Sequence, residues 1–241
     1  MQDYVFFEFR PGVTWLYPIW NELNATTSKP LQEARSNCDS AALGDRAVAV
    51  ATKLAILGTV VGRFNSDYDR LRKLATEDLK RIQINRETRT VWRLADERLA
   101  YDLLADIDAF VFEARSTYEI LGKFLRAFND AIFKQVWHEE NLKAILREGG
   151  GDVEWTTLLR DERILLFHET APWLALKFHD PESVSHELLI VRGNVKTLDD
   201  PESFARLADY NRIYSGLENA LETLQQHIVA KIRAAGREPG S

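Results

Sequence analysis

Four polar residues whose side chains could act on a phosphate lie within one short segment of the sequence: Arg160, Asp161, Arg163 and His168. Arginine binds oxyanions through charge-assisted hydrogen bonds, and an imidazole exchanges a proton near neutral pH. A neighbouring carboxylate would orient an arginine or the imidazole. Together these residue types predict a site that neutralises a phosphate and transfers a proton.

The segment that carries them, residues 155–173, is predicted to be one amphipathic helix. Thr156 or Thr157 is the expected N-cap, and Pro172 ends the helix. On an ideal helix, Arg163 and His168 are about 7.5 Å apart along the axis and about 140° apart around it, so their tips could share one ligand. The alternative is that these charges only solvate an exposed helix face, with His168 hydrogen-bonded near the helix end. The apolar stripe of this helix consists of Leu158, Leu159, Leu165 and Leu166.

The rest of the chain is predicted to be a mainly α-helical bundle. Apolar residues recur every three or four positions in its longest segments, which is the period of a helix that packs on a core. We expect the long helices near residues 90–136 and 202–233 to pack antiparallel. Other helices are expected at residues 13–23 with a break at Pro18, 41–61, 66–84 and 137–147, with a loop at 24–30 and a flexible glycine joint at 149–151.

A small sheet and two atypical ends complete this prediction. Residues 173–178 and 187–191 are short apolar runs after Pro172, and they predict a β-hairpin. Residues 1–30 form an aromatic N-terminal segment, and residues 235–241 are predicted to be a disordered tail. We predict that residues 1–241 form a single domain.

Composition and charge limit the classes of protein to which this chain can belong. The net charge of -6 argues against a protein that coats nucleic acid with its whole surface, but it does not exclude a local site. Neither a run of eighteen apolar residues nor a basic N-terminal region is visible, so we expect a cytoplasmic protein with no membrane association. The single cysteine, Cys38, excludes an internal disulfide and a cysteine-based zinc site.

Several common catalytic and ligand-binding motifs are missing from the sequence. The glycine-rich phosphate loops, the H-E-x-x-H metal motif and the G-x-S-x-G nucleophile motif do not occur. None of the five histidines follows a glutamate by three residues, which argues against a carboxylate metal bundle. We therefore predict no cofactor and no metal.

The segment around Arg163 and His168 resembles the HEPN superfamily (higher eukaryote and prokaryote nucleotide-binding). Members of that superfamily carry, on a late helix of a bundle, an arginine followed by four to six residues and a histidine, usually with a polar residue directly after the arginine. Arg163 and His168 have this spacing, but Ile164 follows Arg163. Arg160 has the polar neighbour Asp161, but seven residues separate it from His168.

The resemblance implies a metal-independent endoribonuclease or an RNA-binding protein, often of a defence or toxin–antitoxin system. In that case His168 is the general acid or base, Arg163 and Arg160 stabilise the oxyanion, and Asp161 orients them. The resemblance also implies a homodimer, with an antitoxin as a candidate protein partner. Two other readings stay open: a non-catalytic helical interaction module, and a protein that binds a nucleotide without turnover.

Overall fold

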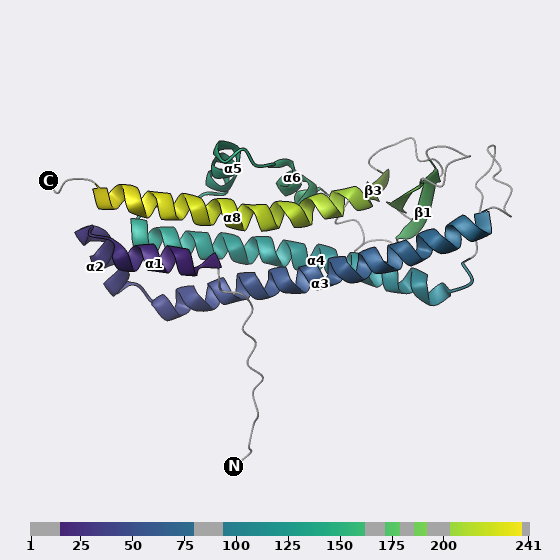
Figure 1. Ribbon diagram of the computed structural model, residues 1–241, viewed down its shortest axis with the longest axis horizontal. Helices are drawn as coiled ribbons and strands as arrows, with labels where there is room; N and C mark the ends of the chain where they lie inside the picture. Colours follow the sequence, from purple (N-terminus) through teal and green to yellow (C-terminus); the bar gives the residue numbers. More distant parts are fainter. Residues whose placement is uncertain (1–14, 80–93, 162–171, 179–185, 192–202, 238–241) are drawn as a thin grey trace, which may run out of the picture. The chain divides into compact units, whose positions relative to one another are not determined.

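The computed structural model describes residues 15–79, 94–161, 172–178, 186–191 and 203–237, and it is mainly α-helical with one small sheet (Figure 1). This confirms the predicted helical bundle with long antiparallel helices and a hairpin late in the chain. The helices are α1 (Tyr17–Ala25), α2 (Lys29–Asn37), α3 (Ser40–Leu79), α4 (Glu97–Phe128), the π-helical turn η2 (Asn129–Phe133), α5 (Glu139–Glu148), α6 (Glu154–Arg160) and α8 (Leu207–Arg237). The strands are β1 (Trp173–Phe178), β2 (His186–Val191) and β3 (Phe204–Arg206).

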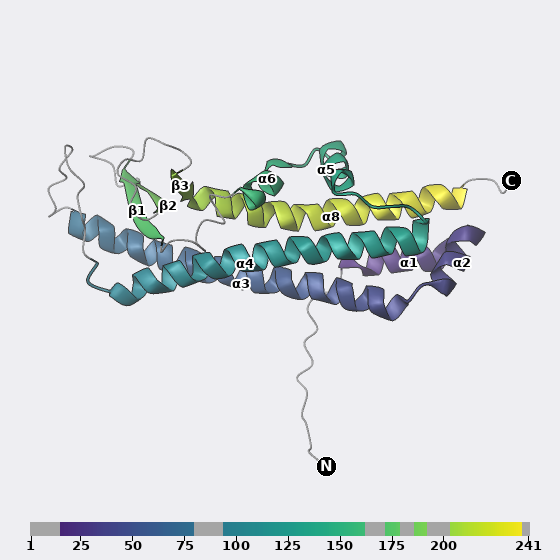
Figure 2. The same cartoon turned by 180° about the vertical axis from the view of Figure 1, so that it is seen from behind.

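The chain divides into two compact units, and each of the three longest helices contributes one part to each unit. Unit 1 consists of Met1–Ile56, Arg115–Val153 and Gly216–Ser241, and unit 2 of Leu57–Ala114 and Glu154–Ser215. Each unit therefore holds part of α3, α4 and α8, and within each unit the three helix parts lie side by side (Figures 1 and 2).

The direction of the long helices follows from their side-chain pairs. Arg63 of α3 pairs with Asp106 of α4, and Arg70 pairs with Asp96 just before α4, so these two helices are antiparallel. Helices α4 and α8 instead run in the same direction, with α3 antiparallel to both (Figures 1 and 2). The expected antiparallel pairing of the two late long helices with each other is therefore wrong, since each has α3 as its antiparallel neighbour.

The core of unit 1 confirms the predicted apolar periodicity. Its α4 and α8 stripes are buried, and they include part of an aromatic cluster in which Trp15 is edge-on to Phe124 and Phe124 is stacked on Phe128. The buried stripe residues are Leu121, Leu125, Phe128 and Ile132 on α4 and η2, and Leu217, Leu221, Leu224 and Ile228 on α8.

Unit 2 contains a three-stranded antiparallel sheet of order β1-β2-β3. The predicted hairpin is confirmed, since β1 and β2 pair antiparallel, and in the observed register Trp173 lies opposite Val191. The third strand was not predicted: Phe204 pairs with Val191, and α8 begins only at Leu207 instead of residue 202. A local helix-start pattern at residues 201–203 was outweighed by pairing with β2 and by burial of Phe204 against Leu189.

Four helix boundaries differ from those predicted. Helix α3 is continuous, because Phe64 is buried where a break was expected. Helix α4 begins at Glu97 and not near residue 90, and the Oδ1 atom of Asp96 accepts a hydrogen bond from the Leu99 N–H. Pro18 lies in the first turn of α1, where proline is tolerated, so it does not interrupt that helix. The predicted loop 24–30 shrinks to the three residues between α1 and α2.

Both ends of the chain are only partly described. Residues 235–237, predicted to be disordered, belong to α8, and the Thr27 hydroxyl donates a hydrogen bond to the Gly236 carbonyl. The rest of the predicted tail, and the first fourteen residues of the aromatic segment, lie outside the described residues.

Helix α3 bears on the expectation that the protein has no membrane association. Within Ser40–Asp78 it contains an eighteen-residue stretch that is long and apolar enough to cross a membrane, and only 28% of that stretch is buried. A core helix of a bundle meets the same criterion, so this feature is weak evidence for a membrane span.

Candidate functional site

The structure places two of the four sequence-predicted site residues. Arg160 is the last residue of α6 and is exposed, and Asp161 follows it in a half-buried position. The Asp161 N–H donates to the carbonyls of Thr157 and Leu158. Arg163 and His168 lie outside the described residues, so the structure does not test whether the four side chains meet.

The predicted helix around these residues needs correction. Helix α6 begins at Glu154, with Thr156 buried inside it, so neither threonine is the N-cap. The helix ends at Arg160, so Asp161 lies outside it. The predicted alignment of Asp161 with His168 required both residues to lie on one continuous helix. Burial of Trp155 anchors the helix one turn earlier than the capping pattern suggested. The predicted apolar side is confirmed at Leu159, which is buried.

A second site, in unit 1, is built around the end of α4. There the helix widens into the π turn η2, and its buried Asn129 donates a side-chain hydrogen bond to the Leu125 carbonyl. Lys134 follows with a φ of 54°, a left-handed conformation that turns the chain out of the helix. Gln135 then donates its N–H to the Asn129 carbonyl. Such π turns recur at functional sites, and this one presents the loop of Gln135, Val136 and Trp137 to two pockets.

The first pocket, here called the cationic pocket, is an open hollow of about 460 Å³. Arg46 of α3 and Lys123 and Arg126 of α4 line it together with Asp130 and Trp137. The three cations are exposed and form no ion pair with any residue of the described ranges, whereas Trp137 is half-buried. Three cations against one carboxylate leave an excess of two positive charges beside an indole ring.

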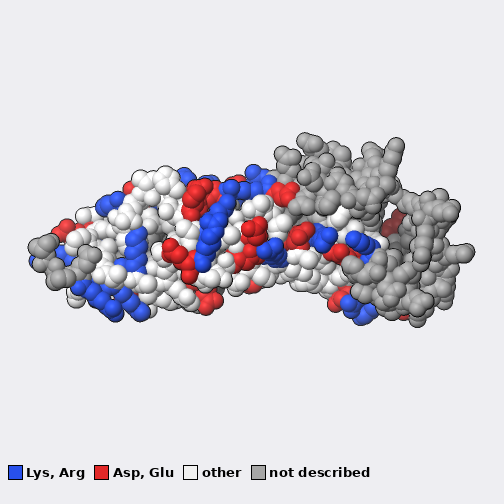
Figure 3. All heavy atoms as spheres, turned by 90° about the horizontal axis from the view of Figure 1, so that it is seen from above, with Lys and Arg blue, Asp and Glu red and all other residues white. Residues whose placement is uncertain are grey.

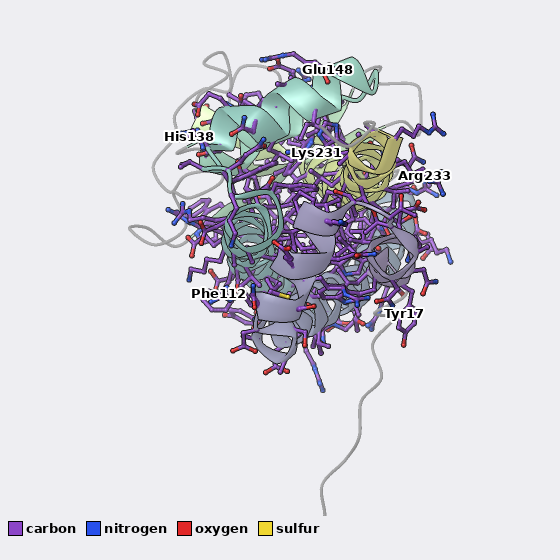
Figure 4. The ribbon with its side chains drawn as sticks, turned by 90° about the vertical axis from the view of Figure 1, so that its left-hand side faces the viewer. Tyr17, Phe112, His138, Glu148, Lys231 and Arg233 are labelled. Carbon is purple, nitrogen blue, oxygen red and sulfur yellow. The ribbon has the colours of Figure 1, made fainter. Side chains whose placement is uncertain are left out.

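The second pocket, here called the inner pocket, is smaller, at about 220 Å³, and lies between α5, α8 and the same loop. Figure 4 shows Lys231 on the side of α8 near α5, which carries Glu148, and Arg233 on another side of α8. The Lys231 Nζ donates to the Oε1 atom of Gln135 at 2.6 Å and lies 4.1 Å from the centroid of the Phe133 ring. Lys231 is thereby held at the pocket wall by an uncharged acceptor and an aromatic face.

Burial lowers the pKa of two groups in the inner pocket. It lowers the pKa of Lys231 below the ordinary value for lysine. His227, one helical turn earlier, has its pKa lowered mainly by burial and then by the charge of Lys231, with a smaller opposite effect from Glu148. A neutral imidazole offers one donor and one acceptor. The pocket thus combines an ammonium, an imidazole, a carboxylate and the side-chain amide of Asn141.

Sequence reasoning missed both pockets. The nearest signals were Lys123 and Arg126, which are exposed and three residues apart on a helix whose other face is the predicted core stripe. Trp137 follows four residues after the end of η2. Neither pattern is sufficient to predict a site, because the pockets also need Arg46 from α3 and Lys231 from α8. Within the described ranges, no three histidine, cysteine or acidic side chains gather as metal ligands.

Comparisons with protein-family models, with curated proteins and with solved structures give no match for this chain. They add no support for the HEPN resemblance, and the ligand class must be inferred from the chemistry of the site.

Proposed function

We propose that this protein binds single-stranded RNA at the cationic pocket of unit 1. The observation that carries the proposal is the grouping of Arg46, Lys123 and Arg126, none of them ion-paired within the described residues, around the half-buried Trp137. Single strands are held by cations that track the phosphates and by aromatic rings on which bases stack. The pocket offers both kinds of contact.

The local character of the pocket fits the charge of the whole chain. With a net charge of -6, affinity for a polyanion has to come from a confined group of cations. On the face that carries α5 and α8, positive and negative side chains are interspersed (Figure 3). Lys123 and Arg126 are three residues apart and so share one face of α4, and Arg46 adds a third cation from α3.

The resemblance to the HEPN superfamily points to the same ligand class. Under this proposal, the residues predicted for catalysis, Arg160, Asp161, Arg163 and His168, would add cleavage to binding in a cytoplasmic homodimer. Binding at the cationic pocket does not depend on that activity, so the two parts of the proposal can be tested separately.

The test measures fluorescence anisotropy of a labelled single-stranded RNA over a range of salt concentrations. In the triple variant Arg46→Ala, Lys123→Ala and Arg126→Ala, affinity should fall, and the slope of log K against log salt should decrease by about 2, since each phosphate contact on a single strand contributes roughly 0.7. Trp137→Ala should weaken binding by about 1 to 3 kcal/mol through lost stacking, with the slope unchanged.

The matched control removes three exposed cations that already pair with carboxylates on helix faces. These are Arg72 with Asp69, Arg98 with Asp102, and Arg115 with Glu119. Their triple alanine variant changes the net charge equally and should bind RNA almost as the wild type does. Equal losses in both triple variants, or no binding by the wild type with its fold intact by circular dichroism, would refute the proposal and favour a helical protein-interaction module.

A further inference from the structure

We infer that the inner pocket receives one unstacked guanine base of the RNA strand held at the cationic pocket. The inference rests on the proposed function and specifies which strands it selects. The two pockets are adjacent because Gln135, Val136 and Trp137 line both of them. A strand whose phosphates lie on Arg126 and whose base stacks on Trp137 would therefore bring its next base to the mouth of the inner pocket.

The size of the inner pocket suits a single base. Pockets for drug-sized ligands have volumes of about 300 to 1,000 Å³, whereas this one has about 220 Å³. It has room for one planar heterocycle and not for a stack of bases. Its apolar walls include Leu224, Ile228 and Ile145, which suit the faces of a base more than a hydrated phosphate.

The polar groups of the pocket favour guanine among the four bases. A lysine ammonium is a preferred partner of the guanine O6 and N7 acceptors, and Lys231 is fixed at the wall by Gln135 and Phe133. The opposite edge of guanine carries the N1–H and 2-amino donors, for which the carboxylate of Glu148 is the matching acceptor. Adenine has no exocyclic oxygen, and uracil has no amino group. Cytosine does carry an oxygen beside a ring acceptor, O2 beside N3, but its amino donor lies on that same edge, whereas guanine presents its O6 and N7 acceptors and its 2-amino donor on different edges.

His227 and Asn141 supply adaptable donors and acceptors beside this pair. Neither side chain is negatively charged, so neither competes with the base for the ammonium of Lys231. Lys231 and Glu148 are therefore the residues expected to determine which base is bound, whereas the cationic pocket determines how tightly any strand is bound.

The test compares a labelled ten-nucleotide oligouridine with the same strand carrying one central guanosine. The wild type should bind the guanosine strand about 5- to 150-fold more tightly, the range expected for one good base contact. Lys231→Gln and Glu148→Gln should each lose most of this preference while binding oligouridine as the wild type does. Arg233→Gln, on the same helix but paired with Glu22, is the matched control and should change neither affinity.

A single-group probe separates the two contacts. Inosine lacks the 2-amino group of guanosine, so the wild type should bind an inosine strand more weakly than a guanosine strand, and Glu148→Gln should bind the two strands equally. Failure of this inference can be told from failure of the proposed function. Equal wild-type affinity for guanosine and uridine strands overturns the guanine pocket alone. No affinity for either strand overturns both.

Discussion

Polar side chains that are partly or fully buried have the most distinctive chemistry in this protein. In unit 1, His227 and Lys231 lie one turn apart on α8 and line one pocket, and burial lowers the pKa of both. In unit 2, the hydroxyl of Tyr210 is buried and has no hydrogen-bond partner among the residues that the structure describes. Each of these environments changes the free energy of unfolding in a way that a single substitution can reveal.

The first prediction concerns the pH dependence of stability. Because the pKa of His227 is lower in the folded state than its ordinary value near 6.5, the unfolded chain binds the proton more readily. His227 therefore contributes stability that is present above about pH 6.5 and is lost as the pH falls through the lowered pKa of the folded state. Between about pH 7 and pH 5, the wild type should lose more stability than His227→Gln in urea melts. Parallel curves for the two proteins would contradict this assignment.

The second prediction compares two tyrosine hydroxyls. The Tyr210 ring packs edge-on against Phe110 at 5.0 Å, while its hydroxyl stays unsatisfied and burial raises its pKa. Tyr210→Phe removes a desolvated group and should leave stability unchanged or raise it by about 1 kcal/mol. Tyr118→Phe is the control: its hydroxyl donates to the Glu139 carboxylate, so this change should cost about 1.5 to 3 kcal/mol. Similar losses in the thermal melts of both variants would show that Tyr210 has a partner.

At the scale of elements, the glycines after α5 form a hydrogen-bonded turn and not the flexible joint expected from composition. Gly149, Gly150 and Gly151 donate their N–H groups to the carbonyls of Ile145, Arg147 and Leu146. Gly150 has a φ of +71°, which side chains with a Cβ rarely adopt. The turn thus caps α5, one of the two helices that form the inner pocket.

The third prediction follows from that geometry. Gly150→Ala should destabilise the protein by about 1 to 2 kcal/mol, because an L-residue is strained in the left-handed region. Gly62→Ala is the matched control, since Gly62 is exposed within α3 and an added Cβ would meet no atom within 4 Å. That change should stabilise by about 0.5 to 1 kcal/mol through helix propensity. If the urea midpoints of both variants shift in the same direction, then an alanine at position 150 does not strain the turn, and the prediction is wrong.

At the scale of the whole molecule, RNA binding and RNA cleavage are separable properties. The cationic pocket belongs to unit 1, whereas Arg160 and Asp161 belong to unit 2. Only one histidine occurs within the predicted catalytic segment. Cleavage would therefore require a second acid or base from a twofold-related copy, which makes dimerisation part of the catalytic hypothesis.

The fourth prediction tests that hypothesis with single-stranded RNA in the presence of a chelator. The wild type should be a dimer by analytical ultracentrifugation and should cut the RNA, and His168→Ala should cut it about 10²- to 10⁴-fold more slowly while remaining a dimer. His179→Ala is the control and should retain activity. If the wild type binds RNA but leaves it intact, the protein is a non-catalytic RNA-binding module. Equal cutting by wild type and His168→Ala would trace the activity to a contaminant.

Periodicity in the sequence was sufficient to predict the long buried helices and the hairpin. Leu121, Leu125 and Phe128 recur at helical spacing and are buried, because the period of an amphipathic helix is a local property of the chain. The alternation from helix to short apolar runs after Pro172 likewise predicted β1 and β2. The residues expected for catalysis were chosen by type and spacing, and of these only Arg160 and Asp161 lie where the structure describes them.

Tertiary packing decided what local patterns could not. Phe204–Arg206 is a strand only because β2 lies beside it, and α3 stays helical past residue 61 because Phe64 is buried. The cationic pocket joins Arg46 to Arg126 and Trp137, and the inner pocket joins Glu148 to Lys231. These residues are far apart along the chain, so their proximity depends on how α3, α4, α5 and α8 pack, which spacing within any one segment does not encode.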